Sequence, residues 1–325
     1  RDLRMSRGLG DVYKRQISEI TGKRKIPFIV ISGNHDSAER LSFASRILRG
    51  TGLFLCGDLY HTLAPVILKD DDGEVAFAPL PYAEPGKVRE ALSTDVHTHE
   101  EAERALSDFL LRQMGHAARK IAIAHEFVAG GSASDSERPL SIGGTDLISA
   151  DIFAPYNYTA LGHLHGPQQA GGKENVRYSG SLLKYSFSEA AQKKGVIVGE
   201  IDGAGQVGTK FTSLAPRHEV RAIKGFFDDL IKGESEDFLM AELLDEGPVI
   251  DAMARLRQKY PRMMTIQSHR RMNSGSGERS FDLMKKVDPL DMFRVFYKEF
   301  QDKEFTEEEE NYMKELWENL RKEDD

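Results

Sequence analysis

Three short apolar runs, each closed by side chains that can bind a metal ion, constrain the fold of this 325-residue chain more than any other feature. Residues 28–32, "FIVIS", lead into Gly33, Asn34, His35 and Asp36; "IAIA" ends at His125; "TAL" leads into Gly162, His163, Leu164 and His165. Short apolar runs bounded by glycine are typical of buried strands. Ligands of open α/β sheets bind beyond the carboxyl ends of the strands. If these strands are parallel neighbours, the polar residues meet in one crevice.

The residue types at these strand ends suit a divalent metal centre. Neutral imidazole and amide or carboxylate oxygen are ligands for Mn²⁺, Fe²⁺ or Zn²⁺. Two such ions about 3.5–4 Å apart can activate a water molecule and hold a phosphoryl group for in-line attack. Gly33 is expected to allow a sharp turn. His163 and His165 would face the same side of an extended backbone, so each could serve a different ion.

Each of these motifs also has a simpler interpretation. A histidine after a strand can be an ordinary loop residue, and residues 33–36 can be a turn with a helix cap. Only the combination of three such motifs favours a metal site. Cys56 is interpreted as a small buried apolar residue rather than a nucleophile.

The order of the predicted elements indicates an α/β protein. Helices are expected at 37–48 and 98–114, the second opened by a capping box of Thr98 and Glu101. Strands are expected at 26–32, 53–56, 120–126, 156–166 and 176–186, with hairpins over 64–81, turning at Asp72-Gly73, and over 195–214.

A smaller α/β module follows Pro216. Strands are expected at 218–225, 237–245 and 263–269, separated by helices at 226–233 and 248–260. Residues 270–280, "RRMNSGSGERS", have the composition of a linker. Two amphipathic helices are expected after it, the second opened by Thr306 and Glu309. Their apolar faces carry Met292, Phe293, Phe296, Tyr297 and Phe300, and then Met313, Leu316, Trp317 and Leu320.

Composition limits the class of protein. The net charge of −8 argues against nucleic-acid binding through bulk charge, although a local basic groove remains possible. No run of about 18 apolar residues is present, so no membrane span is expected. The single cysteine, Cys56, cannot form an internal disulfide, which favours a cytoplasmic location.

The motifs "ISGNHDS", "IAHEFVAGG" and "LGHLH" resemble the metal-binding motifs of the calcineurin-like metallophosphoesterases. The run "YSGSLLKYSFSEAAQKKGVIVGEID", with the module and the terminal helices, is similar to the SbcD exonuclease-subunit family. The resemblance implies a four-layer αββα sandwich over residues 17–215. It further implies a small DNA-binding α/β cap over 216–275, and a linker with partner-binding helices over 276–325.

The resemblance also implies roles for individual residues. Asn34, His125 and His163 would bind the second of two Mn²⁺ ions, and His165 the first. His35 would be the catalytic histidine, which stabilises the transition state or protonates the leaving oxygen, and Asp36 would support it. The expected contacts with DNA phosphates involve Lys184, Lys193, Lys194, Arg270 and Arg271.

The function implied is that of a metal-dependent 3′→5′ double-strand exonuclease and hairpin endonuclease. It would act with an SbcC-type ATPase in DNA repair, recombination and replication, as a homodimer within a heterotetramer. Two alternatives stay open: a phosphodiesterase for another substrate, and a catalytically inactive assembly subunit.

The sequence departs from the family pattern before residue 26. The family has an Asp-x-His strand and then a Gly-Asp-x-x-Asp strand, and no Asp-x-His precedes Ile26 here. Asp11 lies only 23 positions before Asn34, too few for the strand–helix–strand crossover. Residues 1–16 are therefore expected to be non-native, and the first strands and their metal ligands to be missing. We expect this polypeptide to show little Mn²⁺-dependent nuclease activity.

Overall fold

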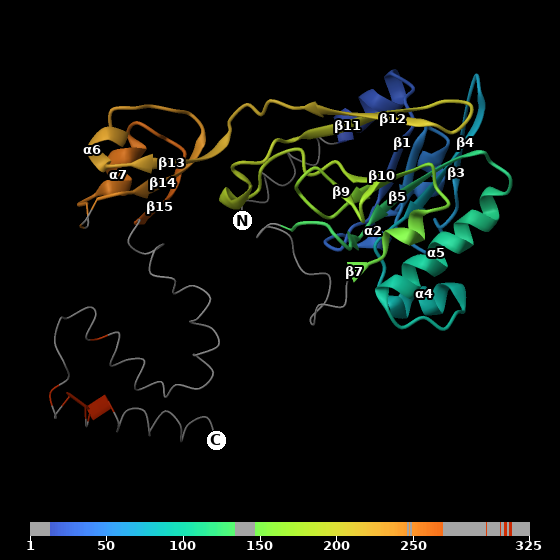
Figure 1. Cartoon of the computed structure of the whole chain (residues 1–325), viewed down its shortest axis with the longest axis horizontal. Helices are drawn as coiled ribbons and strands as arrows, with labels where there is room; N and C mark the ends of the chain where they lie inside the picture. The colour runs from blue at the N-terminus through green and yellow to red at the C-terminus, as the bar shows by residue number, and fades with distance from the viewer. Residues whose placement is uncertain are drawn as a thin grey trace. The chain divides into compact units, whose positions relative to one another are not determined.

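The computed structural model describes residues 14–133, 147–245 and 249–268, together with Gly247 and a few positions from 297 to 313. The chain divides into two compact units, Arg1–Arg221 and Ala222–Asp325, drawn in Figure 1. This division falls a few residues after the expected boundary at 215. The described part is a mixed α/β protein, as expected, and the four-layer αββα arrangement stays a prediction.

A six-stranded mixed sheet is the centre of the first unit. Its strand order is β3-β4-β5-β8-β10-β9. The four inner strands, β4, β5, β8 and β10, are parallel, and β3 and β9 add to the edges in antiparallel orientation. The strand bounds are β3 Val66–Asp70, β4 Gly73–Leu80, β5 Arg119–His125, β8 Tyr158–Gly162, β9 Gln168–Ala170 and β10 Lys173–Tyr178.

Helix α5 (His99–Met114) covers the sheet through its apolar stripe. Leu106 and Leu110 are buried in one core cluster with Ala122 and Ala124 of β5. Helix α4 (Pro85–Leu92) adds Val88 to the same core. Short helical turns complete the unit: η1 Ser18–Lys23, η2 Ala150–Phe153 and η3 Phe187–Glu189, with the strand pair β6 Phe127–Val128 and β7 Leu147–Ile148.

Strands β1 (Phe28–Ile31) and β2 (Leu53–Cys56) form a separate parallel pair. The Tyr82 N–H donates to the Ser32 carbonyl at 3.0 Å, so the end of β1 lies beside the segment that follows β4. The helix expected over 37–48 is two helices, α2 (Ala38–Leu41) and α3 (Ser45–Arg49). Ala44 has a φ of 60°, which interrupts the helical backbone between them.

Two predicted hairpins are present. Strands β11 (Gly195–Ile201) and β12 (Val207–Ser213) pair along their full length. In the β3–β4 hairpin, Asp70 pairs with Gly73, so the two turn residues are Asp71 and Asp72. The turn therefore comes one residue earlier than the sequence predicted.

The second unit has the predicted strand–helix–strand–helix–strand order. Its elements are β13 Val220–Gly225, α6 Phe227–Leu230, β14 Phe238–Leu243, α7 Ala252–Arg257 and β15 Met263–Ser268, and the strand order in the sheet is β13-β14-β15. Leu239, Leu256 and Met263 are buried in its core. The capping box of Thr306 and Glu309 is confirmed, because each side chain accepts from the backbone N–H of the other.

The rest of the predicted linker and terminal helices lies outside the described residues. Among the residues that are described, no helix is both long and apolar enough to cross a membrane.

Candidate metal centre

The carboxyl ends of β1, β5 and β8 bring together three of the side chains predicted to bind metal. His125 ends β5 and is in register with Gly162, the last residue of the neighbouring strand β8. His163 follows directly. Asn34 follows β1, and its Oδ1 lies 3.0 Å from Nε2 of His125, although the two residues are 91 positions apart in sequence. The convergence predicted for these side chains is therefore present.

The two imidazoles at this edge face each other. The ring centroids of His125 and His163 lie 5.4 Å apart at an interplanar angle of 75°, an edge-to-face arrangement. The ring of Phe127 lies 5.8 Å from that of His163 and gives the site an apolar wall. The histidines thus contact each other and hydrophobic surface, not only water.

Glycines on two different elements make room for His125. A Cβ atom on Gly33 would lie 2.6 Å from Cε1 of His125, and one on Gly162 would lie 2.9 Å from its Nδ1. Both separations are shorter than real Cβ contacts. Gly33 does begin a turn, but it has no positive φ, so glycine is required there for space rather than for backbone freedom.

The backbone at His163 is not extended. Its φ is +101°, in a region that non-glycine residues rarely occupy. Leu164, the next residue, is buried in the main core. The prediction that His163 and His165 lie on one side of an extended strand is therefore wrong, because the chain turns between β8 and the buried leucine.

Burial lowers the pKa of His125 to about 4. Desolvation is the main cause, the neighbouring His163 lowers the value further, and Asp36 partly opposes the shift. The imidazole is consequently neutral near pH 7. The neutral form is the one that donates a lone pair to a metal ion.

Two of the donor atoms have the spacing of two adjacent ligands of a divalent ion. Ligand atoms about 2.1 Å from an octahedral ion and at right angles to each other are about 3 Å apart. Asn34 Oδ1 and His125 Nε2 have this separation, 3.0 Å. In the described part of the chain, no three histidine, cysteine or acidic side chains are grouped as a metal site. The group found here has two imidazoles and one amide.

His35 and Asp36 lie on the turn that presents Asn34, and both are exposed. The Asp36 carboxylate accepts from the Gly33 N–H at 2.9 Å, and the Asp36 N–H donates to the Gly33 carbonyl at 3.1 Å. Ser37 then caps α2 by accepting from the Arg40 N–H. Asp36 thus closes the turn from which His35 reaches solvent.

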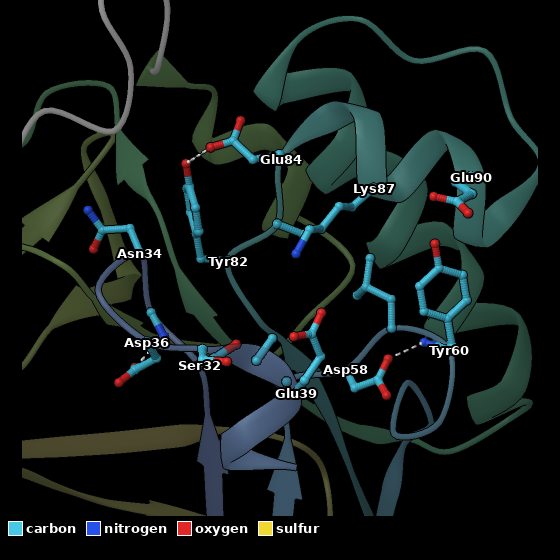
Figure 2. A pocket seen from close by; sticks show the side chains of 16 residues that line it. Ser32, Asn34, Asp36, Glu39, Asp58, Tyr60, Tyr82, Glu84, Lys87 and Glu90 are labelled. Carbon is cyan, nitrogen blue, oxygen red and sulfur yellow. Dashed lines mark hydrogen bonds between the residues drawn. The ribbon is translucent and has the colours of Figure 1, made fainter. Parts of the chain in front are cut away.

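A pocket of about 340 Å³ opens beside this turn, and Asn34 and Asp36 line one side of it (Figure 2). Tyr82 donates to Glu84 at 2.7 Å on another side. The lining contains one ammonium group, that of Lys87, and five carboxyl groups: Asp36, Glu39, Asp58, Glu84 and Glu90. This balance of charge favours cations over free phosphate.

The residues predicted to contact DNA have different environments. The Lys184 ammonium donates to the Ala190 carbonyl and to Glu219, both at 2.8 Å. Lys194 is buried, with 6% of its surface exposed. The contacts of Lys184 and the burial of Lys194 leave little of either side chain accessible to DNA. Lys193 is exposed, and Arg270 and Arg271 lie outside the described residues.

His165 lies near enough to His125 to contribute to the lowered pKa of that imidazole, and it also has partners of its own. Its Nδ1 lies 2.9 Å from Oε1 of Glu189, and its ring packs 5.5 Å from that of Tyr185. Glu189 is fully buried and was not foreseen as a site residue. It stands in "SEAAQKK", a polar stretch typical of a protein surface, so the sequence contains no signal for its burial.

The C-terminal part of the chain is similar to a known family. Residues 216–300 match the SbcD_C family, described as the type 5 capsule protein repressor C-terminal domain. The match includes all of β13 to β15 and extends beyond the cap that the sequence predicted to end at 275. It supports an SbcD-like protein, and with it a nuclease subunit.

Proposed function

We propose that the chain is the nuclease subunit of an SbcD-type complex and hydrolyses phosphodiester bonds of DNA with two Mn²⁺ ions. In this proposal it acts on double-stranded ends in the 3′→5′ direction and opens hairpins. The observation that carries it is the contact of Asn34 with His125, with His163 alongside, at the ends of three strands. The match at residues 216–300 supports the SbcD type.

In this proposal Asn34, His125 and His163 would hold one ion, and His165 would bind the other. When bound, the ions supply a Lewis acid and an activated water. The glycine slot fixes the position of His125, and the low pKa keeps its imidazole neutral, which is the form that can bind a metal ion. In this proposal His35, which is exposed on the turn after β1, donates a proton to the leaving oxygen.

The proposed partner is an SbcC-type ATPase, bound through the segment 276–325. Support for this partner comes from the family match, which covers part of that segment. The negative net charge of the chain agrees with a division of labour in which part of the DNA-binding surface comes from the partner.

The test is cleavage of a 3′-labelled duplex and of a hairpin by the chain with its ATPase partner and Mn²⁺. This polypeptide by itself is expected to cleave little, so the test uses a version that also carries the family's Asp-x-His and Gly-Asp-x-x-Asp strands. In that version we expect Mn²⁺-dependent cleavage that His163→Ala abolishes together with Mn²⁺ binding. His35→Ala should abolish cleavage while leaving Mn²⁺ binding, measured by calorimetry, nearly intact. His116→Ala is the matched control, because His116 is an exposed histidine in the loop before β5.

Two results would contradict the proposal. One is cleavage that persists in His163→Ala or in EDTA. The other is hydrolysis of a cyclic nucleotide or of bis-p-nitrophenyl phosphate with no cleavage of DNA, which would assign the site to another phosphodiester.

A further inference from the structure

Glu189 is a fully buried carboxyl group at the end of the turn η3, with neighbours on three sides. Its Oε1 lies 2.9 Å from Nδ1 of His165. Its Oε2 accepts from the Tyr185 N–H at 3.2 Å and pairs with the Lys194 ammonium at 2.7 Å. Burying a carboxyl group is costly unless such partners satisfy it. Hydrogen bonds and an ion pair with His165, Tyr185 and Lys194 therefore stabilise the buried carboxyl group beside the His165 ring.

Lys194 binds the backbone of His165 as well as Glu189. Its ammonium donates to the His165 carbonyl and to Ser181 Oγ, both at 2.8 Å. The Ser181 N–H donates to the same carbonyl at 3.1 Å. His165 is thus fixed at its ring by Glu189 and at its backbone by Lys194 and Ser181.

The backbone around Ser181 is specialised for this contact. Gly180 has a φ of +77°, and a Cβ there would lie 2.6 Å from the His165 carbonyl oxygen. Only glycine lets residues 180–181 approach His165 so closely. The "SGS" segment (residues 179–181) and the buried Lys194 therefore both fix the backbone of His165.

We propose that Glu189, held by Lys194, is the positioning residue that selects the tautomer of His165. A carboxylate oxygen only accepts hydrogen bonds, so the proton of the neutral imidazole is held at Nδ1. Nε2 then carries the lone pair and is the nitrogen available to a metal ion. Carboxylate–histidine–metal arrangements of this kind fix ring orientation and make the ligand more basic.

This inference rests on the proposed function in one respect only, that His165 binds a metal ion. The tautomer is a property of the metal-free protein and is measured without any ion. In an ion pair with Glu189 the imidazole would carry a proton on both nitrogens, so a neutral Nδ1–H tautomer distinguishes the positioning of a metal ligand from a stabilising ion pair.

The first experiment is ¹⁵N NMR of the imidazoles in the full metal-free chain, with the His165 signals assigned through His165→Asn. We expect the Nδ1–H tautomer in the wild type. In Glu189→Gln/Lys194→Met, which removes both charges of the pair together, we expect a mixture containing Nε2–H. Glu219→Gln/Lys184→Met is the matched control, because it removes the other lysine–glutamate pair of this region and leaves Glu189 in place.

The second experiment is calorimetric titration with Mn²⁺ of the same proteins. We expect the double variant at Glu189 and Lys194 to bind about 10- to 100-fold more weakly, and the control to bind like the wild type. Circular dichroism and the melting temperature show whether each variant is folded.

Three results bear on the inference separately. An Nε2–H tautomer in the wild type would overturn it, even if the double variant fails to fold. An unchanged tautomer and unchanged Mn²⁺ affinity in a folded double variant would overturn it as well. A wild-type chain that has the Nδ1–H tautomer but does not bind Mn²⁺ would support the positioning role and overturn the proposed function.

Discussion

At the residue scale, His125 occupies a slot that two glycines create. Gly33 comes from the turn after β1 and Gly162 from the end of β8, and a Cβ on either would collide with the ring. The sequence places all three residues after apolar runs but does not show that one imidazole needs both glycines. That requirement depends on the register of β5 against β8, which only the folded sheet defines.

Gly33→Ala should therefore displace His125 and weaken the site. We expect a loss of roughly 1–3 kcal/mol in the free energy of unfolding, because the new methyl group meets a ring packed between strands, and weaker Mn²⁺ binding. Urea denaturation and calorimetry measure the two effects. Gly208→Ala in β12 is the control, since a Cβ there has no neighbour within 4 Å. Equal stability and Mn²⁺ binding in Gly33→Ala and the wild type would show that the slot is not tight.

Glu103 in α5 makes stability depend on pH. Burial raises the pKa of its carboxyl group to about 8, and its Oε1 has no hydrogen-bond partner among the described residues. In the unfolded chain the same group titrates near 4.5. Between these two values the folded state keeps a proton that the unfolded state has released, so stability falls as pH rises from about 4.5 to about 8.

Glu103→Gln should remove this slope. The neutral amide has no proton to lose, so the variant should be more stable than the wild type above about pH 8, by a few kcal/mol. Denaturant unfolding at pH 5 and at pH 8.5 measures the difference. The matched control is Glu174→Gln, an exposed glutamate on β10. A wild-type stability that does not decrease between these pH values would contradict the assignment.

At the scale of elements, the sequence correctly predicted the features that depend on short-range interactions, such as helix caps and hairpins. The capping box of Thr98 and Glu101 is present, and α5 begins at His99 as expected. The hairpins and the order of strands in the second unit also follow from short-range patterns. The break between α2 and α3 was missed, because nothing in "AERLSFASRILR" announces a positive φ at Ala44. Helix α3 packs against β2, a tertiary contact that local sequence patterns do not encode.

Thr98→Ala tests the cap of α5. The Thr98 side chain accepts from the Glu101 N–H, and the Glu101 carboxylate accepts from the Thr98 N–H. Removing the hydroxyl should cost about 1 kcal/mol, because one helix N–H loses its partner. Thermal unfolding measures this cost, and Thr98→Ser, which keeps a hydroxyl, should restore most of the stability. Identical melting of the alanine and serine variants would show that the hydroxyl contributes nothing.

At the scale of the whole molecule, the chain is two compact units with separate cores. The sequence predicted both units and the meeting of Asn34, His125 and His163, because parallel strands share one edge for their carboxyl ends. It did not predict that Glu189 and Lys194 are buried at His165. Burial of a charged pair depends on tertiary contacts between η3 and the strands around it, and no periodicity encodes it.

Deleting residues 288–325 should abolish co-purification of the SbcC-type ATPase. The reason is that the apolar faces predicted in this segment would be the docking surface for the partner. Pull-down from co-expressed proteins measures the loss. A variant with Phe226→Ser, an exposed aromatic side chain in the second unit but outside the deleted segment, is the control. Undiminished capture by the deleted chain would refute this assignment.

The positive φ of His163 is expected to lower the thermal stability of the protein at a residue whose imidazole belongs to the candidate metal centre. A histidine at φ +101° costs of order 1–3 kcal/mol, and a glycine there would not. His163→Gly should therefore melt a few degrees higher than the wild type in a thermal scan, while it loses the imidazole that faces His125. At this position the imidazole that faces His125 and a higher melting temperature exclude each other.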